Sequence, residues 1–262
     1  MSNKPIGFFD SGVGGTSIWK EVNLKLPYEN SIYLADSINA PYGEKNKDKI
    51  KALCIKNTEY LLEKGCKLIV VACNTATTNA ISYLRKNYKV PFIGIEPAIK
   101  PAALETNSKA IGILATKGTL SSALFHSTTQ LYTKEVQVIE QEGKGLVPLI
   151  EAGMVFSKET KTLLTNYLKP MLAAEIDRLV LGCTHYPYLI PVLRELLPNN
   201  VKIIDSGKAV AKQTHKILEK LHLLNTSQTI SSHQFYTNVE INVLESFLGD
   251  VSSETKISYL EF

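Results

Sequence analysis

The chain has 262 residues, of which 44% are apolar and 21% charged, close to the average for globular proteins. This composition excludes a disordered, collagen-like or coiled-coil chain. The net charge is only +4, and no dense stripe of Lys and Arg is present, so composition gives no reason to expect a nucleic-acid-binding protein.

The first part of the sequence alternates short apolar runs with longer segments of helical periodicity. We predict strands over Pro5–Phe9, Ser31–Ala35, Lys67–Ala72 and Phe92–Ile95. Between them we predict helices from about Thr16, over Lys47–Lys64 and over Ala76–Asn87. Continuous apolar strands that alternate with helices are typical of a mostly parallel sheet covered on both faces.

The same pattern restarts near residue 110. The predicted strands are Ala110–Ala115, Glu135–Ile139, Arg178–Leu181 and Val201–Ile204. The predicted helices begin near Leu120 and then cover Leu146–Ala152, Lys158–Ala174 and Ile190–Leu197. A helix over Ser206–Leu224, a polar loop over Asn225–Ser232 and a strand, helix and strand ending at Lys256–Leu260 complete the chain.

This restart has detail that indicates a duplicated α/β unit of about 105–110 residues, too long a period for a solenoid. The segment LIVVACNT at 68–75 matches RLVLGCTH at 178–185, which places Cys73 and Cys183 at equivalent positions, each after an apolar strand. The openings IGFFDSG at 6–12 and IGILATK at 111–117 also match. We therefore expect two similar, doubly wound, mostly parallel α/β domains.

Ligands of open α/β sheets bind outside the carboxyl ends of the strands. Those ends carry polar or ionisable residues: Asp10, Ser11, Asp36, Cys73, Asn74, Thr75, Glu96, Thr116, Cys183, Thr184 and His185. If the two units face each other, Cys73 and Cys183 meet in one cleft. One thiolate can then remove a proton from a carbon while the opposite thiol returns one, which inverts that carbon. Asp10 and His185 are placed to assist the thiols.

Each of these residues also has a purely structural interpretation. A buried cysteine is often an inert core residue, Asp10 is able to cap a helix, and Glu151 read alone is a solvated helix residue. Gly12, Gly14 and Gly15 complete neither a dinucleotide-binding nor a Walker A motif; tight-turn geometry is enough to explain them. The remaining histidines, at 126, 215, 222 and 233, are expected at the surface or at helix caps.

The cysteine count and the hydropathy predict the redox state of the thiols and the compartment of the protein. Four cysteines are too few for a disulfide scaffold, and none lies in a CxxC pair, so we expect reduced thiols and no metal site. No apolar run reaches about 18 residues, and the N-terminal segment has no signal-peptide pattern. We therefore expect a cytoplasmic protein without a membrane span.

Five motifs together resemble those of glutamate racemases in the cofactor-independent aspartate/glutamate racemase superfamily. They are FDSGVGG at Phe9–Gly15, PYG at Pro41–Gly43, ACNTAT at Ala72–Thr77, EAG at Glu151–Gly153 and GCTHYP at Gly182–Pro187. They occur in the order and spacing of the family, and the resemblance spans essentially the whole chain. The tail after about Leu224 is less diagnostic.

The resemblance implies roles for individual residues. Cys73 and Cys183 resemble the two catalytic acid/base thiols, Asp10 and His185 the groups that assist them, and Glu151 a further acidic group on the Cys183 side. The implied substrate contacts are Ser11, Pro41, Tyr42, Gly43, Asn74, Thr75, Thr116, Thr119 and Thr184; we add Asp36, at the end of its strand, to these candidates.

The resemblance also implies an overall organisation and a biological role. Two domains related by pseudo-two-fold symmetry are expected, one formed by residues 1–97 with 207–262 and the other by residues 98–206, with the active site between them. Such an enzyme needs no pyridoxal phosphate and no metal, supplies D-glutamate for peptidoglycan, is bacterial and cytoplasmic, and is commonly a homodimer.

Three other hypotheses stay open. The chain is alternatively an aspartate racemase or another isomerase of the superfamily, because the spacing does not distinguish glutamate from aspartate. A non-catalytic, two-lobed module that binds an amino acid or a nucleotide predicts binding without inversion. A protein-interaction role, for instance with a DNA-processing enzyme, has no support from the near-neutral charge.

Overall fold

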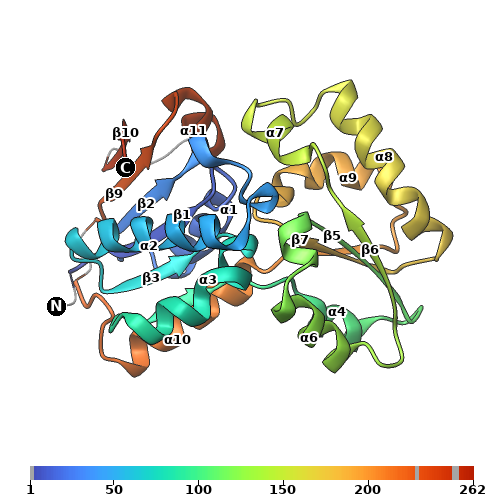
Figure 1. The fold of residues 1–262 in the computed structure, drawn as a ribbon, viewed down its shortest axis with the longest axis horizontal. Helices are drawn as coiled ribbons and strands as arrows, with labels where there is room; N and C mark the ends of the chain where they lie inside the picture. Colours follow the sequence, from blue (N-terminus) through green and yellow to red (C-terminus); the bar gives the residue numbers. More distant parts are fainter. Residues whose placement is uncertain (1–2, 228–229, 250–253) are drawn as a thin grey trace.

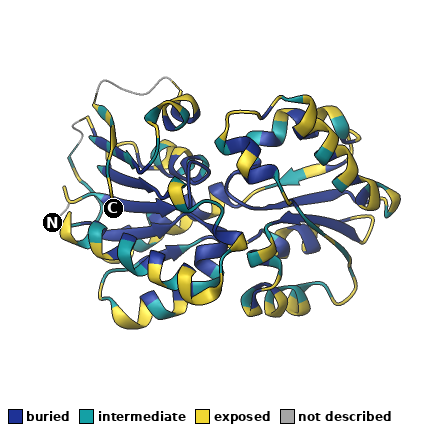
Figure 2. Ribbon diagram, turned by 45° about the horizontal axis from the view of Figure 1, so that its top comes forward, coloured by how far each residue is buried: buried dark blue, intermediate teal, exposed yellow. Residues whose placement is uncertain are grey.

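The computed structural model describes residues 3–227, 230–249 and 254–262 and consists of two α/β halves that lie side by side (Figure 1). The first half contains the two ends of the described chain, and the second contains the middle (Figure 1). Every strand pair in the described residues is parallel. The central strands of both halves are buried, while the outer helix faces are exposed (Figure 2).

The first half is built on a six-stranded sheet with the order β10-β9-β2-β1-β3-β4. Its strands are β1 (Ile6–Asp10), β2 (Ser31–Ala35), β3 (Leu68–Val71), β4 (Phe92–Gly94), β9 (His233–Thr237) and β10 (Thr255–Tyr259). Its helices are α1 (Thr16–Lys25), α2 (Lys47–Glu63), α3 (Asn74–Asn87), α10 (Gly207–Lys220) and α11 (Ile241–Leu248). Phe8 packs into the core that includes α1 and α10, whereas Phe9 packs into the core of α2 and α3. Both faces of the sheet are therefore covered.

The second half is built on a four-stranded sheet with the order β6-β5-β7-β8. Its strands are β5 (Ala110–Ala115), β6 (Gln137–Glu142), β7 (Arg178–Gly182) and β8 (Lys202–Ile204). Its helices are α4 (Ile99–Glu105), α5 (Lys117–Leu120), α6 (Ala123–Tyr132), α7 (Leu146–Glu151), α8 (Lys158–Ala173) and α9 (Ile190–Leu196). Ile113 joins the core formed with α4 and α6, and Leu114 joins the core formed with α7, α8 and α9.

The topology confirms the predicted repeat. The strands β2-β1-β3-β4 have the same spatial order as β6-β5-β7-β8, and β9 and β10 extend only the first sheet. β1 and β5 are central strands whose openings matched in sequence, and β3 and β7 are the strands that precede the two cysteines. On this basis we propose the domain division 1–97 with 207–262, and 98–206.

At α3 and α10 a helix boundary differs from the sequence-based prediction by two or more residues. α3 begins at Asn74 instead of Ala76, because the Cys73 sulfur accepts a hydrogen bond from the backbone N–H of Ala76 and caps the helix. α10 covers Gly207–Lys220 and stops four residues before Leu224. His222 has a φ of 54°, and the N–H of Leu223 donates back to Leu218 O. This left-handed turn closes the helix.

Two further features were not predicted. The short helix α4 lies between β4 and β5, where the sequence analysis placed no element. His233 is buried within β9, where its ring nitrogens lie 2.8 Å from Ser31 Oγ and 3.0 Å from Ser231 Oγ. The prediction of a surface histidine was therefore wrong at this position, because β9 lies inside the sheet next to β2. Burial lowers the pKa of His233 to about 4. Within the described ranges, no helix has the length and apolar character needed to cross a bilayer.

Candidate active site

The carboxyl ends of β1, β3 and β7 meet where the two halves face each other. There a small cavity lies whose walls come from both halves. Cys73 and Cys183 both line it. The other lining residues are Ser11, Pro41, Tyr42, Gly43, Asn74, Thr75, Thr116, Val147, Thr184 and His185.

Cys73 lies at the junction of β3 and α3 and is almost fully buried. Its sulfur accepts from Ala76 N at 3.4 Å and lies 3.7 Å from Ser11 Oγ. Burial raises the pKa of Cys73 well above its ordinary value, and the negative charge of Asp10 raises it further. Cys73 is therefore held as a neutral thiol, which has a proton to give.

Asp10 ends β1 and is completely buried. Its Oδ2 accepts from Gly15 N at 2.8 Å, and Thr184 Oγ1 lies 3.4 Å from its Oδ1, so this carboxylate joins the two halves. Burial raises the pKa of Asp10 to about 6, although the positive charge of His185 and the Gly15 N–H act in the opposite direction. A carboxyl group with this pKa exchanges protons near neutral pH.

Cys183 has different neighbours. Its sulfur lies 3.7 Å from His185 Nδ1, and His185 Nε2 lies 2.5 Å from Glu151 Oε1. Burial alone would lower the pKa of His185, but the hydrogen bonds to Cys183 and Glu151 and their charges outweigh it and raise this pKa well above its ordinary value. His185 is therefore a cation that can stabilise negative charge on the Cys183 sulfur.

Glu151 is held in place by both halves. Besides His185, its Oε1 accepts from Val13 N at 2.8 Å, and its Oε2 accepts from Ser37 Oγ at 3.1 Å. It ends α7 and has only 16% of its side chain exposed. The interpretation of Glu151 as a solvated helix residue is thus wrong, and the carboxylate orients His185 instead.

The glycines that follow β1 are explained by close packing, whereas the sequence analysis explained them by the geometry of a tight turn. None of Gly12, Gly14 and Gly15 has a positive φ. A Cβ on Gly12 would lie 2.0 Å from Glu151 Oε1, and one on Gly14 would lie 2.2 Å from His185 Nδ1. Gly12 and Gly14 leave room for side chains of the opposite half, which sequence reasoning missed, whereas a Cβ on Gly15 would meet Asp10, Tyr33 and Ala72 of its own half.

Polar groups surround the remaining walls. The side-chain oxygen and nitrogen of Asn74 are buried and have no hydrogen-bond partner among the described residues, so they are available to a bound molecule. Thr75 Oγ1 lies 2.8 Å from Thr116 Oγ1 and 3.4 Å from Thr119 Oγ1, which brings hydroxyl groups of both halves together. Thr119 is buried behind Thr116 and is not among the described residues that line the cavity.

Asp36 is likewise not among the described residues that line the cavity. Its Oδ2 accepts from Tyr42 OH at 2.5 Å, and its Oδ1 accepts from Asn39 Nδ2 and Asn238 Nδ2. Both carboxylate oxygens are therefore occupied by protein donors. We propose that Asp36 holds Tyr42 in the cavity wall and does not contact substrate itself.

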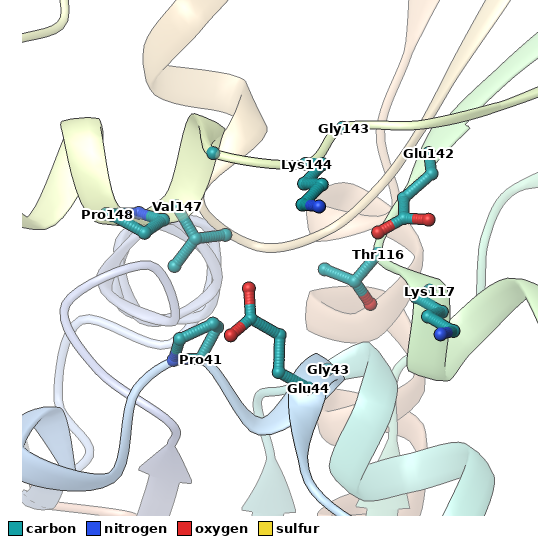
Figure 3. A pocket seen from close by; sticks show the side chains of 11 residues that line it. Pro41, Gly43, Glu44, Thr116, Lys117, Glu142, Gly143, Lys144, Val147 and Pro148 are labelled. Atoms are coloured by element: carbon teal, nitrogen blue, oxygen red, sulfur yellow. The ribbon is translucent and has the colours of Figure 1, made fainter.

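The cavity opens to solvent through a charged mouth. Pro41, Gly43, Thr116 and Val147 belong both to the cavity and to this outer pocket. Figure 3 shows Glu44 reaching into the opening from the first half, with Lys144, Glu142 and Lys117 across it on the second half. Sequence analysis missed these residues and Val147. A usable signal for Val147 was its position four residues before Glu151, on the same face of α7.

The arrangement can perform proton transfer on two faces of one small molecule. It combines a neutral thiol, a thiol beside a cation, and hydrogen-bond donors able to stabilise negative charge on the bound molecule. No group of three or more His, Cys, Asp or Glu side chains in the described part of the chain could hold a metal ion.

Comparisons with known proteins give a consistent result. Residues 24–214 match the family model for Asp/Glu/hydantoin racemases. The glutamate racemase of Stutzerimonas stutzeri is 46% identical over 233 residues, which cover 88% of each chain. Crystal structures of glutamate racemases superpose over nearly the whole chain. A Bacillus anthracis isoform has a TM-score of 0.88, 28% identity and coverage of 100% of this chain and 98% of that chain. The Escherichia coli enzyme, in complex with L-glutamate and the activator UDP-MurNAc-ala, has a TM-score of 0.85, 32% identity and 98% coverage of both chains.

Proposed function

Since this chain belongs to the Asp/Glu/hydantoin racemase family, we propose that it is a glutamate racemase that interconverts L- and D-glutamate. Membership of the family makes the chain an isomerase. Glutamate as the substrate is supported by the names of the similar proteins and by the L-glutamate bound to the E. coli enzyme. The observation that carries the mechanism is that Cys73 and Cys183 line one cavity from equivalent positions of two repeats.

In the proposed mechanism, the two cysteines act on opposite faces of the α-carbon. The Cys183 thiolate takes the α-hydrogen of one enantiomer as a proton, and the electron pair of the broken C–H bond stays on the substrate. The Cys73 thiol then donates its proton to the other face, forming the new C–H bond and leaving a Cys73 thiolate. The reverse reaction exchanges these roles. Cys73 lies beside the Asp10 carboxyl group, whereas Cys183 lies beside the cationic His185. This difference supports Cys73 as the proton donor and Cys183 as the proton acceptor in this direction.

The neighbouring groups reset the thiols. Asp10 shares a buried environment with Cys73, and its pKa of about 6 allows it to pass a proton to or from that side. His185, oriented by Glu151, stabilises the Cys183 thiolate. Ser11, Asn74, Thr75, Thr116 and Thr184 supply hydrogen bonds to the substrate, and Pro41, Tyr42 and Gly43 form the wall opposite Thr116 and Val147.

We further propose the biological setting that the family resemblance implies. The D-glutamate would serve peptidoglycan synthesis and thereby cell-wall formation and cell shape. The enzyme would work in the cytoplasm as a homodimer and without a cofactor. Two of the similar proteins come from S. stutzeri and E. coli, which supports the bacterial setting.

The test is circular dichroism of L-glutamate mixed with purified protein and no added cofactor. The signal should decay to zero as the racemic mixture forms. In deuterated water the product enantiomer should carry α-deuterium from the first turnovers, because thiol protons exchange with solvent. Inversion with retained protium would contradict the two-thiol mechanism.

A substrate panel distinguishes the alternatives. Faster inversion of aspartate than of glutamate would replace glutamate by aspartate as the substrate. Binding of either amino acid without inversion, unaffected by thiol alkylation, would instead identify a non-catalytic binding module.

A further inference from the structure

Asn238 lies just beyond the end of β9 and connects the C-terminal part of the chain to the loop that follows β2. It is buried, with 6% exposure. Its Nδ2 donates to Asp36 Oδ1 at 2.6 Å, and its Oδ1 accepts from the backbone N–H of Ile38 at 2.9 Å. Both ends of this one amide are therefore used on the loop of residues 36–43, which we call the Tyr42 loop.

The bond to Asp36 leads to the cavity wall. Asp36 is completely buried, and its second oxygen accepts from Tyr42 OH at 2.5 Å. Tyr42 lines the cavity with both cysteines. A buried carboxylate needs several donors to offset its lost hydration. Without Asn238, Asp36 would keep Asn39 and Tyr42 but lose its shortest donor on Oδ1, so its position and that of the Tyr42 hydroxyl would no longer be fixed.

The bond to Ile38 leads to the other side of the site. Ser37, the preceding residue, donates to Glu151 Oε2 at 3.1 Å, and Glu151 orients His185 beside Cys183. Ser37 is thus placed between a contact with the second half and a backbone group that Asn238 holds. One amide restrains both the Tyr42 side chain and the Ser37 contact.

We propose that Asn238 is a positioning residue of the racemase reaction, which fixes the Tyr42 loop against the substrate and the Glu151–His185 pair. It touches neither cysteine and acts through Asp36 and Ile38. The C-terminal strands β9 and β10, which have no counterpart in the second sheet, would then belong to the catalytic apparatus. The proposal rests on the proposed function, because its main readout is racemisation.

The main experiment measures kcat and KM of Asn238→Ala with L-glutamate. The expected result is a KM about 10-fold higher, because the substrate must order the Tyr42 loop on binding, with a smaller fall in kcat. Asn225→Ala is the matched control: Asn225 lies in the same C-terminal part and donates to Tyr28 O at 2.7 Å, away from the Tyr42 loop. Its KM should stay within 2-fold of wild type. Unchanged kinetics in Asn238→Ala, or an equal change in both variants, would overturn the proposal.

A second measurement tests the route through Asp36. Tyr42→Phe removes the hydroxyl that Asp36 accepts from. If Asn238 acts through this hydroxyl, the effects of Tyr42→Phe and Asn238→Ala on KM should combine to clearly less than their product in the double variant. Full multiplicativity would contradict that route. If Asn238→Ala does not fold, Asn238→Asp, which places a second carboxylate against Asp36, replaces it in the same comparison with the same expected rise in KM.

A third measurement separates this proposal from the proposed function. The rate at which iodoacetamide alkylates Cys73 should rise several-fold in Asn238→Ala, because a loosened Tyr42 loop opens the cavity. A wild-type protein that does not racemise glutamate would overturn the proposed function, while the alkylation rates would still report on the loop. An active wild type with equal alkylation rates in wild type and Asn238→Ala would overturn only the role of Asn238.

Discussion

The two cysteines occupy equivalent positions of a repeated fold but have opposite electrostatic neighbours. Cys73 shares its burial with the carboxyl group of Asp10, and Cys183 lies beside the cationic His185. The sequence repeat shows where this difference arises. Asp10 ends β1 and Ser11 follows it, whereas Ala115 ends β5 and Thr116 follows it. The repeat thus places two thiols at matched positions, and the differences in adjacent residues support the proposal that one donates a proton while the other accepts one.

Removing either thiol should have the largest effect, because inversion needs a proton carrier on both faces. Cys73→Ser and Cys183→Ser should each lower kcat for glutamate racemisation by about 10³-fold or more, since a serine hydroxyl is a far weaker acid than a thiol. Circular dichroism of L- and D-glutamate measures this directly. Cys66→Ser is the matched control, because Cys66 is buried in the first-half core and is not among the described residues that line the cavity. Normal turnover in either active-site variant would show that the substituted cysteine is not needed for racemisation. The difference between the neighbours of Cys73 and Cys183 would then not bear on catalysis.

Variants of the neighbours should separate the two sides. Asp10→Asn and His185→Asn should each lower kcat by about 10- to 10³-fold. Because the equilibrium constant between enantiomers is one, kcat/KM must fall equally in both directions, so the side is read from isotope effects with α-deuterated glutamate. Each variant should raise the isotope effect for the enantiomer whose hydrogen its own cysteine takes and lower it for the other. The two variants should therefore change the isotope effects in opposite senses; changes in the same sense would contradict the assignment of sides.

Much of the fold was predictable because the central strands are short apolar runs between polar segments. β2 and β5 coincide residue by residue with the predicted Ser31–Ala35 and Ala110–Ala115. The placement of the site at the carboxyl ends of β1, β3 and β7 follows from parallel strands. The predicted residues Cys73, Cys183 and His185 lie together in one cavity for this reason, and their catalytic roles stay a proposal.

What the sequence could not reveal are contacts between residues far apart along the chain. Asp36 was grouped with the substrate contacts because it follows a strand. In the structure its carboxylate accepts hydrogen bonds from Tyr42 and from Asn238, which lies 202 residues later in the chain. Gly12 and Gly14 have their role only because Glu151 and His185 approach from the other half. Hydrophobic periodicity predicts which face of a helix or strand is buried. It does not predict which residue of the other half contacts that face.

The ionised carboxylate of Asp10, buried beside Cys73, should lower the stability of the folded protein. Its pKa is raised from 3.8 to about 6 on folding, so its favourable contribution to stability is complete below about pH 4 and is lost as pH rises through 6. Asn at this position does not ionise. The free energy of unfolding of Asp10→Asn relative to wild type should therefore increase by up to about 3 kcal/mol between pH 4 and pH 8. Urea unfolding at both pH values measures it, and a pH-independent difference would contradict the raised pKa.

The smallest expected effect concerns the mouth of the cavity, where the second half presents cations as it does beside Cys183. Lys117 and Lys144 line the mouth together with Glu44 and Glu142 and form no ion pair within the described part of the chain (Figure 3). Without the two lysines, only carboxylates would face the proposed acidic substrate at the mouth. Lys117→Gln with Lys144→Gln should lower kcat/KM for glutamate about 2- to 5-fold at low salt through KM, with kcat unchanged, and should weaken its salt dependence. Lys208→Gln with Lys212→Gln on α10 removes the same charge far from the mouth. An equal loss in that control pair would mean that net charge, and not the position of the lysines on the Cys183 side, attracts the substrate.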